Sequence, residues 1–257
     1  MIQTAIEAAK AAGKILLENF DKNKEISVKD DKSLVSNIDI ACEKKIEEII
    51  LEKFPEHDFL GEENDRIDKG SDYKWVVDPL DGTNNYVNEI PMYGVSIALA
   101  YKDEPILGVI YLPFFDELYT AEKGKGCFLN EKKRMEIKEK PLDQSLVLMS
   151  SHYLKLNTPD ALRLVQKVYK TFLEIRITGC AVFNVAMFLK NSFGGGASTN
   201  VKPWDLAAGV VMAREAGGIA TNHNGDDWTI NDDRIVIGNK VCHERILEIV
   251  QMENKND

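Results

Sequence analysis

The chain has 257 residues, of which 44% are hydrophobic and 29% are charged, and its formal net charge is −10. This length and composition predict a soluble globular protein, either one large domain or two closely joined halves. The acidic balance argues against a general nucleic-acid-binding protein, which would need a basic face, and is compatible with an acidic metal site.

Two helices are predicted in the first 60 residues. The first has apolar residues at helical spacing, namely Ile6, Ala9, Gly13, Leu16, Leu17 and Phe20. The polar stretch 22–31 is expected to be a loop or an edge hairpin. Ser36 or Asp39 then caps a second helix, which Pro55 ends and whose buried stripe is Cys42, Ile46, Ile49, Ile50 and Phe54. A short buried strand, Phe59 and Leu60, leads into the acids Glu62 and Glu63.

The following part of the chain is rich in predicted strands. Residues 64–74 are charged and expected to be exposed. From Lys74 to Leu129, short apolar or alternating runs are separated by proline, glycine and charged residues, as in KWVVD, YGVSIALAYK, PILGVIYLP and ELYTAEKG. This pattern is typical of sheet strands joined by hairpins.

Strands and helices alternate in the rest of the chain. SLVLMSS predicts a strand, and residues 159–173 predict a helix that buries Leu162, Val165, Val168 and Phe172. A strand passes into a helix around Gly179, and another helix runs from Trp204 to the glycines at 217–218. A strand, a turn at 223–227, the strand RIVIGN and a final helix follow. The change in pattern near residue 140 predicts an N-terminal α+β half, 1–140, and a C-terminal α/β half, 141–257, that together form one catalytic unit.

Signals of several other protein classes are missing from the sequence. No segment is long and apolar enough to cross a membrane, and the N-terminus has charged residues where a signal peptide would have an apolar core. The four cysteines lie far apart, which predicts reduced, inert thiols in a cytoplasmic protein. None of the four histidines belongs to a zinc-type cluster such as HExxH.

The stretch WVVDPLDGTNNY, residues 75–86, carries the strongest chemical signal. Asp78 and Asp81 flank a proline with no Lys or Arg in the stretch, and two carboxylates a few ångströms apart would repel each other by several kcal/mol at a partly buried site. Oxygen ligands without cysteine or histidine favour a hard cation, Mg²⁺ or Mn²⁺. The Leu80 carbonyl could face this ion, and the backbone N–H groups of Gly82 and Thr83 could bind phosphate oxygens.

Two more acids stand in comparable settings. Glu62 follows a short strand, and Asp205 lies in the first turn of a predicted helix, where an acid also complements the helix dipole. Each of them alone is an ordinary surface or capping acid. Only the combination with Asp78 and Asp81 predicts a site.

Three stretches together resemble the inositol monophosphatase family of Mg²⁺-dependent, lithium-sensitive phosphatases. They are GEE at 61–63, WVVDPLDGTNNY at 75–86 and PWDLAAGVVMAREAGG at 203–218, and their order and spacing are similar to the family pattern along almost the whole chain. The resemblance implies a layered α/β/α/β/α sandwich of the sugar-phosphatase type, within the α+β class, and a homodimer. It also implies hydrolysis of inositol monophosphate or a related small phosphate ester. Nucleic-acid and membrane partners are not expected, because the chain is acidic and has no long apolar segment.

The resemblance also implies roles for individual residues. A first Mg²⁺ would be held by Glu62, Asp78 and the Leu80 carbonyl. A second would be held by Asp78, Asp81 and Asp205, and a third, weaker ion by Glu62. Thr83 and Asp39 would orient an attacking water, with Glu63 a further catalytic candidate. The phosphate and the leaving group would contact Gly82, Thr83, Gly179, Cys180, Ala181, Ser198 and Asp205.

The sequence departs from the family pattern at the leaving-group end. Cys180 replaces the usual small hydroxyl residue, Ser198 stands where inositol phosphatases commonly have glutamate, and Gly194 replaces a typical aspartate. Gly194–Gly196 is expected to be a flexible loop. Ser198 is then either a solvent-facing loop residue or a cause of altered leaving-group preference.

Other functions remain open at this point. Fructose-1,6-bisphosphatase, 3′-phosphoadenosine phosphatase and NADP phosphatase belong to the same superfamily. A non-enzymatic regulatory protein that retains the fold is an alternative of another class. Because every expected metal ligand is present in the sequence, catalysis is favoured.

Overall fold

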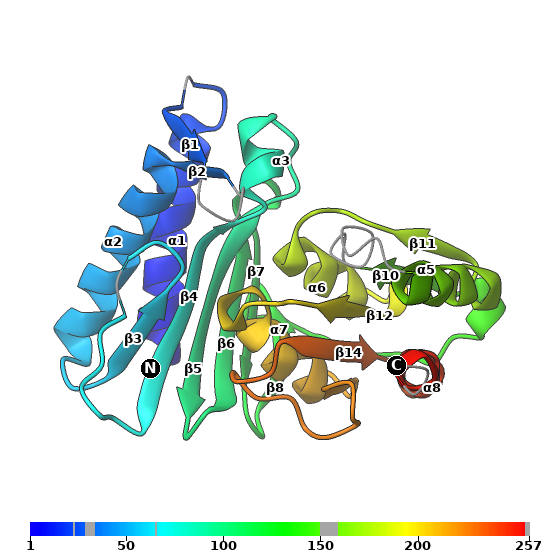
Figure 1. Cartoon of the computed structure of the whole chain (residues 1–257). Coiled ribbons are helices and arrows are strands. Elements are labelled where there is room, and N and C mark those ends of the chain that lie inside the picture. Colours follow the sequence, from blue (N-terminus) through cyan, green and yellow to red (C-terminus); the bar gives the residue numbers. More distant parts are fainter. Residues whose placement is uncertain (23, 29–33, 65, 150–158, 255–257) are drawn as a thin grey trace.

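The computed structural model describes residues 1–22, 24–28, 34–64, 66–149 and 159–254. Their helices and strands form five layers, α/β/α/β/α, around a seven-stranded and a five-stranded sheet (Figure 1). The predicted α+β class and the layered sandwich are confirmed.

The outer layer on one side consists of α1 (Ile2–Asn19) and α2 (Asn37–Lys53), which pack against each other. Along the chain, the two helices are separated by the antiparallel pair of β1 (Ile26–Val28) and β2 (Leu34–Ser36), in the region where a loop or edge hairpin is expected. Ser36 is the N-cap of α2, and its hydroxyl accepts the Ile38 N–H at 3.2 Å.

The seven-stranded sheet has its strands in sequence order. They are β3 (Asp58–Gly61), β4 (Tyr73–Asp81), β5 (Gly94–Tyr101), β6 (Glu104–Leu112), β7 (Glu117–Glu122), β8 (Gly126–Leu129) and β9 (Lys133–Arg134). Only the β3–β4 pair is parallel. The short helix α3 (Thr83–Val87) follows β4 directly, and a 3₁₀ turn at Pro113–Phe115 joins β6 to β7.

The second sheet has the strand order β11-β10-β12-β14-β13. These strands are β10 (Leu146–Met149), β11 (Glu174–Arg176), β12 (Phe193–Thr199), β13 (Ile219–Thr221) and β14 (Arg234–Gly238). A 3₁₀ turn at Leu142–Gln144 precedes β10. Helices α6 (Ala181–Leu189) and α7 (Pro203–Glu215) lie between the two sheets, and α5 (Pro159–Thr171) and α8 (Lys240–Asn254) cover the far face (Figure 1).

Three apolar clusters fill the spaces between the five layers. One joins α1 and α2 to the first sheet, one surrounds α6 and α7, and one joins α5 and α8 to the second sheet. Because α7 comes from the C-terminal part of the chain and packs on β5 and β6, the two sheets share the middle core. The division into halves at residue 140 stays a prediction.

The expected flexible loop at Gly194–Gly196 is wrong. These glycines lie inside β12, which pairs with β10 on one side and β14 on the other. A Cβ on Gly195 would lie 2.5 Å from the Ile237 carbonyl oxygen, and one on Gly196 would lie 2.5 Å from that of Leu148. Glycine is therefore required by the close approach of neighbouring backbones and not by mobility.

Some residues of the predicted helical stripes face the solvent. Leu17 is 43% exposed because it is one position beyond the buried Leu16 and points about 100° around the helix. Leu162 is 47% exposed, and Leu164 takes its place on the buried face of α5. Residues 150 and 151 of the predicted strand SLVLMSS lie outside the described residues. Within the described ranges, no helix combines the length and the apolar character that crossing a membrane would require.

Candidate active site

A bulge in β4 brings Asp78 and Asp81 to the same side of the sheet. Asp78 pairs with Ser96 of β5 and Asp81 pairs with Gly94, so three steps along β4 match two steps along β5. Side chains three positions apart in a regular strand point to opposite faces, but one extra residue restores the same face. Pro79 occurs within this central strand because it lies in the bulge, where no ladder hydrogen bond from its nitrogen is needed.

Asp78 is almost completely buried, with 2% of its surface exposed. Its Oδ1 accepts the Leu80 N–H at 3.0 Å. Burial raises the pKa of Asp78 well above its usual range, and the negative charges of Glu62, Asp81 and Asp205 raise it further. Four acids from three separate segments of the chain therefore act on one another at this position.

Asp81 and Asp205 are each held by backbone donors. Asp81 Oδ2 accepts the Val182 N–H, at the start of α6, at 2.5 Å. Burial raises the pKa of Asp81 to about 6, although this hydrogen bond lowers it. Asp205 Oδ2 accepts the Lys202 N–H at 3.0 Å in the first turn of α7. Burial, with the charges of Asp81 and Glu62, raises the pKa of Asp205 to about 7. A cation among these groups would offset the burial of their charges and their mutual repulsion, which together raise these pKa values.

Thr83 and Asp39 lie in direct contact. The Thr83 hydroxyl is 3.1 Å from Asp39 Oδ1 and 3.0 Å from the Leu80 carbonyl oxygen, so it donates to one of them at a time. The other oxygen of Asp39 accepts from the backbone N–H and the hydroxyl of Ser36, at 2.9 and 2.5 Å. Asp39 thus completes the capping box of α2 and also presents a carboxylate oxygen to Thr83.

Cys180 faces Asp81 from the start of α6. Its thiol lies 3.3 Å from Asp81 Oδ2, and its sulfur accepts the Phe183 N–H at 3.4 Å as the N-cap of the helix. Gly179 precedes it with a φ of +74°, a backbone conformation that favours glycine. The amide of Asn85 joins this turn to the segment after α3, because it donates to the carbonyl oxygens of Met92 at 2.8 Å and Thr178 at 3.0 Å.

Ser198 is a partly buried residue of β12, so the alternative of a solvent-facing loop residue is wrong. It lines a hollow of about 50 Å³ together with Ala181 of α6 and Leu206, the neighbour of Asp205. Most of the other side chains around this hollow are apolar, namely Leu148, Val185, Phe188, Ala197, Ile235 and Ile237. The hollow therefore connects three parts of the expected leaving-group region.

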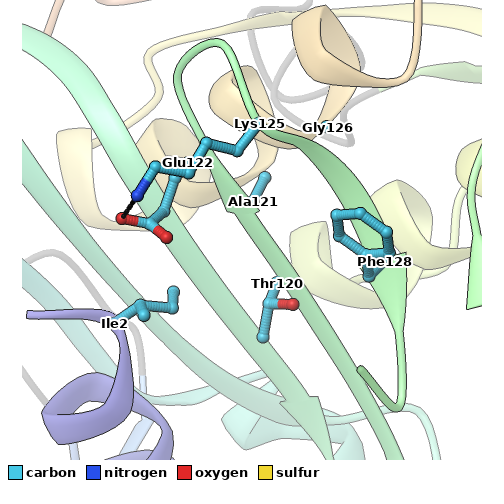
Figure 2. Close-up of a pocket in the computed structure, with 7 residues that line it drawn as sticks. All are labelled: Ile2, Thr120, Ala121, Glu122, Lys125, Gly126 and Phe128. Carbon is cyan, nitrogen blue, oxygen red and sulfur yellow. Dashed lines mark hydrogen bonds and ion pairs between the residues drawn. The ribbon is translucent and has the colours of Figure 1, made fainter. Parts of the chain in front are cut away.

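A second hollow lies elsewhere, at the hairpin of β7 and β8, and none of its lining residues belongs to the candidate site. Figure 2 shows its lining residues, with an ion pair between Glu122 and Lys125 at 3.0 Å. The other labelled residues are Ile2, Thr120, Ala121, Gly126 and Phe128.

Two residues near the site, Glu43 and Asn85, are not among the site residues predicted from the sequence. Glu43 is fully buried on α2 and accepts backbone N–H groups of Glu63 and Asn64. Its position one helical turn after Asp39, on the same buried face, is a signal that could have identified it. Asn85 belongs to the quoted stretch 75–86, but its partners Met92 and Thr178 are apparent only in the folded chain.

The donor set at the site consists of oxygen atoms, which suits Mg²⁺ or Mn²⁺. Among the residues that the structure describes, no group of three or more His, Cys, Asp or Glu side chains is close enough together to hold a metal ion by itself. Mg²⁺ is commonly bound by one or two carboxylates, with waters and substrate oxygens as its other ligands. The acids around Asp78 fit such an open site, because they act electrostatically on one another without closing around one point.

Comparisons with known proteins show which family this chain resembles. The family model described as "Inositol monophosphatase family" matches residues 1–255. A relative from Aquifex aeolicus named fructose-1,6-bisphosphatase/inositol-1-monophosphatase is 37% identical over 97% of this chain and 95% of its own length. A relative from Haemophilus influenzae named Nus factor SuhB is 32% identical over 97% of this chain and 95% of its own.

A solved structure is similar over the same extent. The extragenic suppressor protein SuhB from Bartonella henselae has a TM-score of 0.89 and 31% sequence identity, and the match covers 96% of this chain and 97% of that one. The likeness therefore extends over nearly the whole of both chains. This chain belongs to the inositol monophosphatase family.

Proposed function

We propose that this protein is a Mg²⁺-dependent phosphomonoesterase that hydrolyses inositol monophosphate or a related small sugar or polyol phosphate with a metal-activated water. The observation that carries the proposal is the group of Asp78, Asp81 and Asp205, whose pKa values are raised by burial and by the charge of Glu62, beside the Thr83–Asp39 pair. Family membership and the names of the relatives support a phosphatase.

In this proposal Glu62, Asp78 and the Leu80 carbonyl would contribute ligands to one Mg²⁺, and Asp78, Asp81 and Asp205 to another. Waters and substrate oxygens would complete both coordination shells, because no three acids of the described residues are gathered around one point. Bound Mg²⁺ would neutralise phosphoryl oxygens and lower the pKa of a bound water. A third, weaker ion would rest on Glu62, and Mn²⁺ could replace Mg²⁺.

The protein's own groups would then position the reactants. Thr83 would accept a hydrogen bond from the attacking water while its hydroxyl donates a hydrogen bond to Asp39. Ser36 keeps Asp39 in place. Glu63, beside Glu62, stays a further catalytic candidate. The N–H groups of Gly82 and Thr83 would hold the phosphate. Gly179, Cys180 and Ala181 would lie along one side of the leaving group, and Ser198 and Asp205 along the other.

The leaving-group specificity is proposed to be broad. A glutamate at position 198 would make a charge-assisted contact to sugar hydroxyls, worth about 1.5–3 kcal/mol where it is buried. Ser198 is shorter and neutral, and the hollow beside it is mostly apolar. We therefore expect activity on several monoesters, and the name of the Aquifex relative supports fructose 1,6-bisphosphate as a candidate beside inositol 1-phosphate.

A second candidate is a regulatory role in a transcription complex, supported by the name Nus factor SuhB of a similar relative. The two roles do not exclude each other. The cytoplasmic location and the homodimer stay predictions; the second can be checked by light scattering of the purified protein.

The test of the proposed function is a phosphate-release assay with inositol 1-phosphate, fructose 1,6-bisphosphate, 3′-phosphoadenosine 5′-phosphate, NADP and 2-glycerophosphate. We expect activity with Mg²⁺, loss with EDTA and recovery when Mg²⁺ is restored. The matched control is Asp81→Asn, which should remove most of the turnover. Absence of Mg²⁺-dependent release from every substrate would refute the proposal and favour the regulatory role.

A further inference from the structure

Helix α2 presents a second buried carboxylate to the site, and the mechanism above does not use it. Glu43 is 0% exposed and lies one helical turn beyond Asp39, so both side chains are on the same face of the helix. Asp39 contacts Thr83, whereas Glu43 contacts the segment that follows β3.

The two oxygens of Glu43 bind two successive backbone donors. Oε2 accepts the N–H of Glu63 at 2.9 Å, and Oε1 accepts the N–H of Asn64 at 2.7 Å. Hydrogen bonds to a charged acceptor are stronger than those between neutral groups. The backbone immediately after Glu62 is therefore held at two points by one side chain.

Gly61 supports the same arrangement independently. A Cβ at this position would lie 2.4 Å from the carboxyl carbon of Glu43 and equally close to one of its oxygens. Any other residue would push the carboxylate away from the N–H groups that it binds. The glycine of the GEE stretch is thus explained by the space that Glu43 needs.

The sheet alone does not determine where Glu62 points. The parallel pairing of β3 with β4 ends at Gly61, opposite Val77, so Glu62 is the first residue beyond the paired strand. Its charge nevertheless acts on Asp78, Asp81 and Asp205. An additional restraint is required to hold a side chain in a defined place at the end of an edge strand.

We propose that Glu43 is a positioning residue that fixes the backbone of residues 61–64 and thereby holds Glu62 at the metal site. The inference rests on the proposed function, because it assumes that Glu62 is a metal ligand. Replacing a group that hydrogen-bonds to a metal-binding segment and orients its ligand typically weakens metal affinity by about 10- to 100-fold.

The test compares Glu43→Gln with Glu48→Gln, the same change at a residue of α2 whose side chain is 54% exposed. Glutamine keeps the shape of the side chain but turns an NH₂ group toward one of the two backbone donors. Mn²⁺ binding followed by electron paramagnetic resonance gives a dissociation constant without any turnover. We expect this constant to rise about 10- to 100-fold in Glu43→Gln and to stay unchanged in Glu48→Gln.

Two further variants separate positioning from general damage to the fold. Glu62→Gln removes the proposed ligand, and adding Glu43→Gln to it should weaken Mn²⁺ binding no further, because Glu43 acts through Glu62. Gly61→Ala should weaken Mn²⁺ binding as Glu43→Gln does while leaving the carboxylate chemically intact. Partial unfolding would lower the number of sites per molecule, whereas the dissociation constant reports the folded molecules alone.

The outcomes are distinct. If the wild type binds Mn²⁺ and the dissociation constant is unchanged in Glu43→Gln, the inference is overturned and the proposed function stands. Fully additive effects of Glu43→Gln and Glu62→Gln also overturn it. A wild type that binds no Mn²⁺ overturns the proposed function and the inference together.

Discussion

Replacing Asp81 with asparagine should stabilise the metal-free protein while it abolishes catalysis. The pKa of Asp81 is about 6 in the folded protein, against 3.8 for an ordinary aspartate. Burial is the main cause, and the Val182 N–H opposes it without cancelling it. Folding above pH 6 therefore forces a charge on a group that the folded environment prefers to keep neutral.

The magnitude follows from this difference in pKa. The rise of the Asp81 pKa from 3.8 to about 6 means that the charged carboxylate opposes folding by about 3 kcal/mol, since each unit of pKa difference corresponds to about 1.4 kcal/mol. The side chain is partly exposed, so solvent screening reduces this figure and we expect a gain of about 1–2 kcal/mol in Asp81→Asn at pH 8.

The pH dependence has a definite sign. Because the folded pKa is raised, the folded protein binds more protons than the unfolded chain between about pH 4 and 6, so the wild type loses stability as the pH rises through this window. At pH 4.5 the wild-type carboxyl is largely neutral in the folded state. The advantage of asparagine should therefore shrink there to less than about 1 kcal/mol.

The measurement is the free energy of unfolding in urea, in EDTA, at pH 4.5 and pH 8. Asp143→Asn, a change at an exposed aspartate, serves as the control and should have little effect at either pH. Saturating Mg²⁺ should stabilise Asp81→Asn less than the wild type, because the variant keeps the proposed ion site of Glu62, Asp78 and the Leu80 carbonyl but loses a ligand of the other one. The reasoning is refuted if Asp81→Asn is less stable than the wild type by the same amount at both pH values.

Four shorter predictions follow from the same structure. Thr83→Ala should lower kcat by roughly 100-fold and change KM less than about threefold, because the hydroxyl positions water and the phosphate keeps its other contacts; steady-state kinetics with a raised KM and unchanged kcat would show a binding role. Ser198→Glu should raise the ratio of kcat/KM for inositol 1-phosphate to that for 2-glycerophosphate about tenfold, and an unchanged ratio would mean that residue 198 does not contact the leaving group. Gly195→Ala should lower the free energy of unfolding by about 1–3 kcal/mol, because the new methyl group meets the Ile237 carbonyl oxygen at 2.5 Å; equal urea midpoints would contradict the close packing of β12 on β14. Millimolar lithium should inhibit phosphate release, as the family resemblance implies, and insensitivity would indicate a different ion site at Asp78, Asp81 and Asp205.

The sequence alone determined most of the secondary structure. Periodic apolar residues and Pro or Gly boundaries predicted α2, α6, α7 and the hairpin strands β5 to β7 close to where they lie. These signals are local, because helix and strand periods are written in consecutive residues. The family could also be recognised from the sequence, because the order and spacing of three short stretches survive without any knowledge of contacts.

The tertiary structure decided what glycine and polar residues do. Gly194–Gly196 has the composition of a loop, and only the approach of β10 and β14 explains why a buried strand needs it. Ser198 accordingly lies on a strand beside an apolar hollow.

The arrangement of the acids also depended on the folded chain. Asp78 and Asp81 are expected from the sequence to share one site, although residues three positions apart lie on opposite faces of a regular strand. The bulge opposite Ser96 and Gly94 is what turns both side chains the same way. In the sequence, Glu43 is one of several acids on a predicted helix. Its hydrogen bonds to the backbone after β3 are apparent only in the folded chain. In each case the deciding contact joins residues that are far apart along the chain, and no local pattern encodes such a contact.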